Sequence, residues 1–289
     1  MAQAVFPANF QLIPALSPVH RRLAADFVRA MGSIIALPPP TWKWLSITAA
    51  QTLVSASTYA TERTDPAAYS KFATVSKAGK KLGPVVPSRV GMLIIYGPAL
   101  VAAAVQCSGS LDGTPGLLAG MLLGHFAKRT MEVLLLHKYS GSMPSGMACA
   151  IGSFYALTVL LMNAAVRTEP AASGPPGFTG LGTLLYFVGQ AGNFYHHWLL
   201  ATLRKDGGDT KTYSVPQGGL FPYVSSPHYF FELVAWWGMA VATRQINCGL
   251  VALSMTGYLA GRSVSVSEWY QKTVKGFPAS RKHLVPFLF

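Results

Sequence analysis

Residues 116–144 read GLLAGMLLGHFAKRTMEVLLLHKYSGSMP, an apolar run that is interrupted by ionisable side chains. His125, Lys128, Arg129 and Glu132 recur at helical spacing, so one face of a helix presents all of them. A Lys or Arg at the centre of a bilayer costs about 2.5–3.5 kcal/mol, so this face is expected to point into the protein. The stretch predicts a membrane helix that contributes to a cofactor or substrate site. A Lys/Arg–Glu network that only joins helices is the alternative.

The composition extends this prediction to the whole chain. Of its 289 residues, 51% are hydrophobic and 11% are charged, against roughly 25% charged in soluble domains. The apolar residues gather in runs of bilayer length that polar loops separate. We therefore expect an all-α integral membrane protein with about seven transmembrane helices, or six if the weak first one fails. The expected helices are 42–60, 90–106, 116–136, 145–165, 181–200, 229–245 and 249–266.

The chain divides into three predicted parts. They are an N-terminal extension at 1–40, N-terminal helices with a basic cytosolic loop at 41–115, and a C-terminal helical region at 116–289. The glycine-rich stretch AASGPPGFTGLG at 171–182 lacks a complete GxGxxG motif. No Rossmann domain is therefore expected, and any nucleotide must bind in another way.

The formal net charge of +13 has a simple explanation in a membrane protein. No basic helix, zinc spacing or RNA-binding aromatic motif accompanies it, so we expect no nucleic-acid partner. Lys and Arg concentrate in the 61–89 loop, the 201–228 loop and the C-terminal tail, which lie on one side of a seven-helix chain. Because basic loops favour the cytoplasm, the C-terminus is predicted to be cytosolic. The membrane bilayer is also expected as a partner of the protein.

Polar residues also close the fifth expected helix, in GNFYHHWLLATLRK, which includes Asn193 and Arg204. The adjacent His196 and His197 point about 100° apart on a helix, and no HxxxH pair completes a coordination shell. No metal site is therefore expected. These polar groups are predicted to meet the membrane interface or a cofactor.

Two further charges stand inside expected helices. Glu232 follows the loop that contains His228 and Tyr229, and Trp236 lies one turn beyond it. A carboxylate there is costly unless it accepts hydrogen bonds from a bound group or from a neighbouring cation such as Arg262. The guanidinium fork of Arg262 suits a phosphate, so the sequence leaves a cofactor site and an internal ion pair both open.

Several segments together resemble one family. In chain order they are HFAKRTMEVLLLHKYSGSMP, GNFYHHWLLATLRK, YSVPQGGLFPYVSSPHYFFE, GRSVSVSEWY and FPASRKHLVPFLF, between residues 117 and 289, and SRVGMLIIYGPA extends the match more weakly to residue 88. They are similar to the steroid 5α-reductase C-terminal family, which includes polyprenol reductases and trans-2-enoyl-CoA reductases. The whole chain looks most like plant-type 3-oxo-5α-steroid 4-dehydrogenase family proteins.

The resemblance implies a multi-pass endoplasmic-reticulum enzyme that uses NADPH to reduce a C=C bond conjugated to a carbonyl in a lipid. It also implies that the 116–289 region binds the cofactor. The matching positions for cofactor contacts are Asn193, Arg204, Tyr213, His228, Glu232, Trp236, Arg262 and Tyr270. His228 stands where steroid reductases have Asn, and His197 stands where they have Asp.

The chain departs from the steroid pattern at the substrate end. Steroid reductases hold the 3-ketone with a Glu and a Tyr at the positions of Tyr96 and Phe126, and Phe cannot donate a hydrogen bond. Lys128 and Tyr229 match the proton-handling residues of enoyl-CoA reductases. We expect Tyr96, Lys128 and Tyr229 to be catalytic. Steroids and enoyl thioesters are both open as substrates, and polyprenols are a third, less favoured class. A membrane methyltransferase and a non-catalytic membrane partner are the alternatives from other classes.

Overall fold

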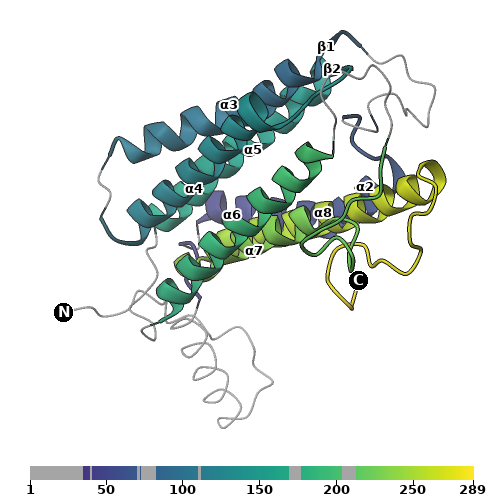
Figure 1. Ribbon diagram of the computed structural model, residues 1–289. Helices are drawn as coiled ribbons and strands as arrows, with labels where there is room; N and C mark the ends of the chain where they lie inside the picture. The colour runs from purple at the N-terminus through teal and green to yellow at the C-terminus, as the bar shows by residue number, and fades with distance from the viewer. Residues whose placement is uncertain are drawn as a thin grey trace, which may run out of the picture.

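A computed structural model describes residues 35–39, 41–69, 72, 83–109, 112–168, 177–203 and 213–289. Within these ranges the chain is mostly helical (Figure 1). Arg204, most of the basic 61–89 loop and nearly all of the 1–40 extension lie outside the described residues. The long helices are α2 (Trp42–Thr64), α3 (Ser88–Cys107), α4 (Gly113–Met131), α5 (Ser145–Thr168), α6 (Phe178–Thr202), α7 (Pro227–Thr243) and α8 (Ile246–Thr273).

The seven expected helical segments are all found as helices, with ends within a few residues of the prediction except at α8, which runs on to Thr273. The third segment holds a feature that its apolar pattern does not signal. Here α4 ends at Met131 and continues as one π-helical turn, η3 (Glu132–Leu136). Such turns are rare and recur at functional sites, and this one begins at the buried Glu132.

One short antiparallel sheet is present among the described residues. Strand β1 (Val85–Pro87) pairs with β2 (Ser142–Pro144), and Val86 lies opposite Met143. Because β1 leads directly into α3 and β2 into α5, the pair holds the N-terminal ends of these two helices together.

The helices pack in neighbouring pairs, with α6 along α7, α2 along α8, and α3 along α5 (Figure 1). Glycines permit the closest of these approaches. A Cβ atom at Gly182 or Gly189 of α6 would stand 2.2 or 2.4 Å from a backbone nitrogen of α7. Small residues that let two backbones touch are typical of helix pairs in membranes.

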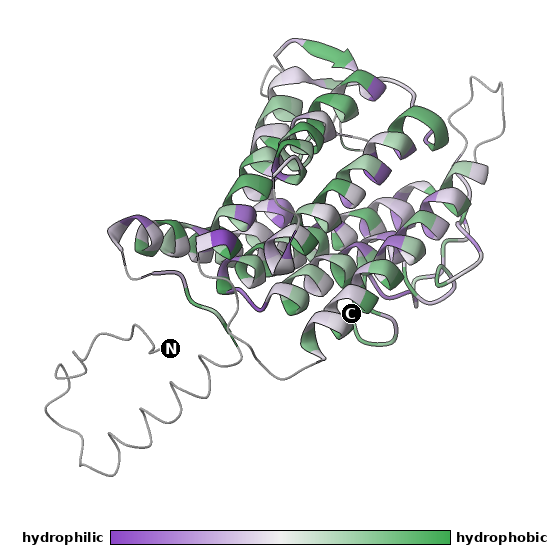
Figure 2. Cartoon of the chain, turned by 90° about the vertical axis from the view of Figure 1, so that its left-hand side faces the viewer, coloured by the Kyte–Doolittle hydropathy of each residue, from purple (hydrophilic) through white to green (hydrophobic). Residues whose placement is uncertain are grey.

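Two helices are long and apolar enough to cross a membrane by length and composition. They are α3 and α5. Hydrophobic residues are spread along the helices of the bundle in Figure 2. Large apolar side chains such as Leu53, Leu135 and Phe187 are exposed. The remaining five crossings stay predictions.

Candidate active site

An ion-pair network forms where α4 passes into η3. The Lys128 ammonium donates to Glu132 Oε1 over 2.9 Å and also to the Asn193 side-chain oxygen. Arg129 Nη1 donates to Glu132 Oε2 over 2.7 Å. The predicted common face is therefore confirmed for these three charges. His125 lies one turn earlier and contacts Gln190 of α6.

Arg129 also reaches across to α3, where Tyr96 is only 6% exposed. Its Nη2 donates to the Tyr96 hydroxyl oxygen over 2.6 Å, and the guanidinium carbon lies 4.8 Å from the ring centre. A phenol that accepts from a cation keeps its own O–H to donate. The positive charge beside the oxygen polarises the phenol, so the Tyr96 O–H is a better donor than it would be without Arg129.

Helix α6 contributes the other side of the network. His197 Nδ1 lies 3.1 Å from Glu132 Oε2, and Asn193 donates to the His228 carbonyl oxygen over 2.8 Å. The ring of His228 lies beside that of His197, with 5.3 Å between their centres. Thus Tyr96, Lys128, Asn193 and His228, which are far apart in the sequence, meet around Glu132.

Glu132, His137 and His197 have ligand-type atoms within 4.8 Å of one another, which invites a metal interpretation. Arg129 Nη1 already contacts both Glu132 Oε2 and His197 Nδ1, at 2.7 and 3.0 Å. A metal ion would have to stand beside this guanidinium and the Lys128 ammonium. The arrangement is therefore better described as an ion-pair network than as a metal site. The pKa of His137 falls to about 3, chiefly because burial disfavours its charged form and then because of the charges of His197 and Arg129.

Glu232 and Trp236 lie one turn apart on α7, and both are buried, at 6% and 0% exposure. Glu232 makes no hydrogen bond or ion pair with the described part of the chain, and the Trp236 Nε1 has no acceptor there. Burying the Trp236 N–H without an acceptor costs roughly 1–3 kcal/mol. Their position therefore favours a polar ligand that accepts from Trp236 and donates to Glu232.

Arg262 has internal partners in this structure. Its Nη1 donates to Glu62 Oε1 over 2.8 Å and to the Ala67 carbonyl over 2.9 Å, and Nη2 donates to the Tyr69 carbonyl over 3.1 Å. The suggestion that Arg262 pairs with Glu232 is wrong, because Glu62 of α2 takes that place. The phenol of Tyr229 lies close enough for the Arg262 charge to act on it.

The last two predicted cofactor residues lie in a separate aromatic cluster. Tyr213 packs edge-on against Trp269, with ring centres 4.5 Å apart, and Tyr270 stacks on Phe277 at 4.9 Å. Tyr229 packs against this cluster and also lies near Arg262. The predicted residues thus form one set around Glu132, a pair on α7, and an aromatic group at the C-terminal end of α8.

Sequence reasoning missed Glu62, Gln190 and Tyr155, which all contribute polar atoms near these sets. Glu62 stands just beyond the apolar segment 42–60, and Tyr155 stands within the apolar segment 145–165. A polar group within an apolar segment, or directly at its end, is the signal that could have found each of them.

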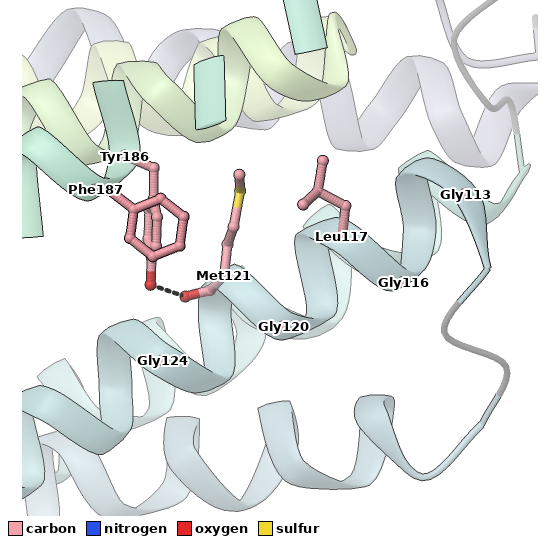
Figure 3. A pocket seen from close by; sticks show the side chains of 8 residues that line it. All are labelled: Gly113, Gly116, Leu117, Gly120, Met121, Gly124, Tyr186 and Phe187. Atoms are coloured by element: carbon pink, nitrogen blue, oxygen red, sulfur yellow. Dashed lines mark hydrogen bonds between the residues drawn. The ribbon is translucent and has the colours of Figure 1, made fainter. Parts of the chain in front are cut away.

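A groove of about 470 Å³ between α4 and α6 lies apart from these residues (Figure 3). Gly116, Gly120, Gly124, Tyr186 and Phe187 contribute to its wall, and the Tyr186 hydroxyl donates to the Met121 carbonyl over 2.7 Å. Its lining includes none of the predicted catalytic or cofactor residues. The groove is an apolar surface and offers no chemistry of its own.

Comparison with known proteins adds independent information. Residues 161–289 match the family model described as 3-oxo-5-alpha-steroid 4-dehydrogenase. The human protein named 3-oxo-5-alpha-steroid 4-dehydrogenase 1 is 30% identical over 215 residues, covering 71% of this chain and 81% of the relative. The rat protein of the same name is 32% identical over 179 residues, covering 60% and 67%. The mouse 3-oxo-5-alpha-steroid 4-dehydrogenase 2 is 28% identical over 232 residues, covering 78% and 89%.

The human relative's match spans most of both chains, and the family model covers α6, α7 and α8, which supply Asn193, His197 and the α7 pair. The chain therefore belongs to the 3-oxo-5-alpha-steroid 4-dehydrogenase family, a family of oxidoreductases.

Proposed function

We propose that this chain is a membrane reductase that uses NADPH to saturate a C=C bond conjugated to a carbonyl in a lipid, with 3-oxo-4-ene steroids as the substrate class. The names of the relatives support the steroid class. The observation that supports the chemistry best is the buried Tyr96 phenol held by Arg129, because it provides an activated donor in a water-poor setting.

The reaction places specific demands on the protein. NADPH, when bound, supplies the hydride that adds to the carbon β to the carbonyl. The electron pair of the double bond then moves toward the carbonyl oxygen, where negative charge develops, and a proton completes the α-carbon. Tyr96 is suited to donate to that oxygen, and a preorganised donor of this kind is typically worth about 10²–10³ in kcat.

Lys128 and Tyr229 are the proposed proton-handling groups. Two of the three ammonium hydrogens of Lys128 are directed at Glu132 and Asn193, which fixes the side chain and leaves one hydrogen for a ligand. Tyr229 lies beside Arg262, which can hold the phenol oxygen in a fixed position. Both groups are held by charged partners, as proton transfer at a fixed position requires.

The proposed cofactor contacts fit NADPH at its polar, uncharged parts. Glu232 can accept from an amide or ribose hydroxyl, and Trp236 can donate from its unpaired N–H. Arg262 keeps one buried N–H without an acceptor and is proposed to face the phosphate end, although Glu62 binds its other side. The remaining proposed contacts are Asn193, Arg204, Tyr213, His228 and Tyr270.

The proposed location is the endoplasmic-reticulum membrane, with several crossings and a cytosolic C-terminus. Alkaline carbonate should leave the protein in the membrane pellet, and a C-terminal tag should be open to protease on sealed microsomes. Release into the supernatant would exclude an integral protein, and a protected tag would reverse the orientation.

The functional test uses membranes that contain the protein, with NADPH or NADH and a panel of 4-ene-3-ketosteroids, trans-2-enoyl-CoAs and polyprenols. We expect saturated steroid products and a clear preference for NADPH. Turnover of enoyl-CoAs alone would assign the chain to thioester reduction, and turnover of polyprenols alone to polyprenol reduction. Binding of S-adenosylmethionine without binding of NADPH would favour a methyltransferase.

A further inference from the structure

Tyr155 is a buried residue whose hydroxyl bonds to none of the described residues. The residue lies on α5 and is only 8% exposed. Its ring stacks on Tyr96, with centres 6.0 Å apart and planes 26° apart, and meets the Phe126 ring edge at 5.6 Å. Its hydroxyl makes no hydrogen bond with the described part of the chain, whereas the Tyr96 hydroxyl oxygen accepts from Arg129.

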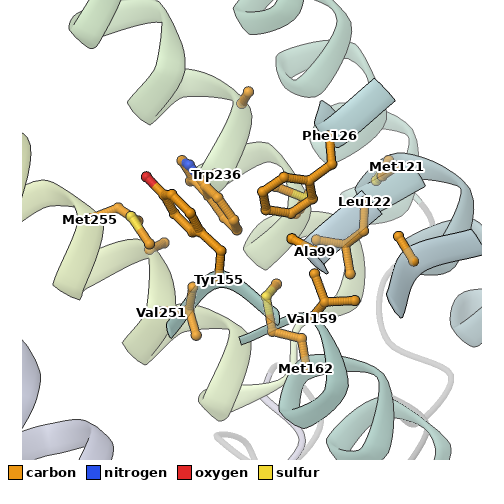
Figure 4. Close-up of a cluster of buried hydrophobic side chains, with 14 of the residues drawn as sticks. Ala99, Met121, Leu122, Phe126, Tyr155, Val159, Met162, Trp236, Val251 and Met255 are labelled. Atoms are coloured by element: carbon orange, nitrogen blue, oxygen red, sulfur yellow. The ribbon is translucent and has the colours of Figure 1, made fainter. Parts of the chain in front are cut away.

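The surroundings of this hydroxyl are those of the proposed active site. The charged or ionisable groups that act on the Tyr155 phenol include Tyr96, Glu232 and Arg129. Figure 4 draws its oxygen and the Trp236 ring nitrogen pointing to the same side, away from Phe126. Trp236 Nε1 also has no acceptor among the described residues. The Tyr155 hydroxyl of α5 and the Trp236 N–H of α7 therefore have no acceptor among the described residues, near the Tyr96–Arg129 pair.

Phenylalanine at position 155 would fill almost the same space and bury no polar atom. Because the Tyr155 hydroxyl bonds to none of the described residues, the packing of its ring does not account for it. Phe126, whose ring touches Tyr155, has no hydroxyl to offer from α4. Tyr96 and Tyr155 thus form a stacked pair of phenols beside the Arg129 guanidinium.

We propose that Tyr155 is a catalytic residue that donates a second hydrogen bond to the carbonyl oxygen of the substrate, beside Tyr96. This inference rests on the proposed reduction of a conjugated carbonyl. Two donors from two helices would hold the oxygen in place and share its negative charge as the enolate forms, in the manner of an oxyanion hole. No bond to Tyr155 forms or breaks in this role.

The first test is Tyr155→Phe, which keeps the ring and deletes only the donor. With a 4-ene-3-ketosteroid, kcat should fall by about 10²–10³, the usual effect of losing one oxyanion donor. The KM for NADPH should not change. The thermal midpoint should not fall, because the ring contacts are kept and no hydrogen bond to a described residue is lost. Tyr195→Phe, at an exposed position of α6, is the matched control and should leave all three values unchanged.

The second test needs no cofactor or turnover. A steroid with a naphthol in place of the enone ring mimics the enolate, and its fluorescence distinguishes the neutral naphthol from the naphtholate. Tyr155→Phe should weaken the binding of this probe at least tenfold and shift the bound probe toward its neutral form. A lower thermal midpoint with unchanged probe binding would instead make Tyr155 a packing residue.

The outcomes separate the two proposals. If the parental protein reduces none of the enones, the proposed function fails, and the probe alone then decides the role of Tyr155. If the parental protein is active but Tyr155→Phe matches it in kcat and probe affinity, the Tyr155 proposal is overturned. A parental protein that does not bind the probe would overturn it as well.

Discussion

Arg129 of α4 connects three other elements of the proposed site. It donates to Tyr96 of α3 and to Glu132 of η3, and it contacts His197 of α6. A guanidinium suits this position because its planar fork directs several N–H donors at once and stays charged when buried. The hydrogen bond from Arg129 to Tyr96 gives the buried guanidinium an acceptor and also orients the phenol. Arg129 therefore both stabilises the fold and positions a proposed catalytic group.

Replacing Tyr96 by Phe tests that shared role. The ring would still pack against Tyr155, but the donor would be absent. We expect kcat for an enone to fall by about 10²–10³ with little change in NADPH affinity. Steady-state kinetics and cofactor titration provide the two values. Near-parental turnover in a stably folded variant would remove Tyr96 from the proposed mechanism.

Glu132→Gln tests the balance of charge in the network. The change removes the anion that Lys128 and Arg129 share, and leaves two buried cations without it. Breaking a buried pair in this way typically costs about 3–5 kcal/mol, so the thermal midpoint in detergent should fall markedly.

The matched control is Glu268→Gln, which breaks a partly exposed pair with Arg63. Exposed pairs contribute about 0–1 kcal/mol, so little change is expected. Equal effects of the two substitutions would show that the buried network does not stabilise the helices.

His137, just beyond the third expected helix, makes stability depend on pH. The unfolded chain binds a proton near pH 6.5, whereas the folded chain binds it only near pH 3. Protonation therefore favours unfolding in this window, and the stabilisation is lost as the pH falls from 6.5 toward 3. Unfolding midpoints measured across this range should fall less steeply in His137→Asn than in the parental protein. Identical slopes would mean that His137 titrates normally.

At the scale of helices, the α6–α7 pair depends on glycine. A Cβ at Gly189 would lie 2.4 Å from the Ala235 nitrogen and 2.7 Å from the Phe231 oxygen, and backbone cannot yield locally. Gly189→Ala should therefore separate the helices and cost about 1–3 kcal/mol, the usual penalty of overpacking. A drop in thermal midpoint measures it.

Gly180→Ala is the control in the same helix, because a Cβ there meets nothing within 4 Å. It should be neutral or slightly stabilising, since alanine favours helix by up to about 1 kcal/mol over glycine. A stable Gly189→Ala variant would show that the close approach is not required.

The helices themselves were predictable, because each apolar run is long and ends at polar or proline-containing segments. Across the junction of α4 and η3, the Lys128–Glu132 and Arg129–Glu132 pairs followed from helical spacing alone. The π turn at η3 was not predictable, since no residue pattern there distinguishes it from an ordinary helical end.

Contacts between distant segments could not be predicted either. Glu62 and Arg262 lie 200 positions apart, and only the packing of α2 along α8 brings them together. The same holds for Tyr155 beside Tyr96, which depends on α3 packing along α5. A single sequence gives helical faces, whereas the choice of partner for each face is a property of the assembled bundle.

At the scale of the whole molecule, the exposed and the buried residues differ from those of a typical soluble protein. Apolar side chains are exposed on several helices, while charged and hydrogen-bonding groups gather inside the bundle. Such an arrangement suits a bilayer outside and a reaction of a polar group inside. Membership of the 3-oxo-5-alpha-steroid 4-dehydrogenase family agrees with the proposed type of reaction.

The central claim is that the protein itself transfers a hydride from NADPH to the β-carbon of a conjugated lipid ketone. The direct measurement uses purified protein, a 4-ene-3-ketosteroid and NADPH that carries deuterium at the transferable position of the nicotinamide. The account predicts a saturated ketone with one deuterium on the carbon β to the carbonyl, and a far lower yield with Tyr96→Phe. A folded parental protein that forms no labelled product, or that forms a product without deuterium, would contradict it.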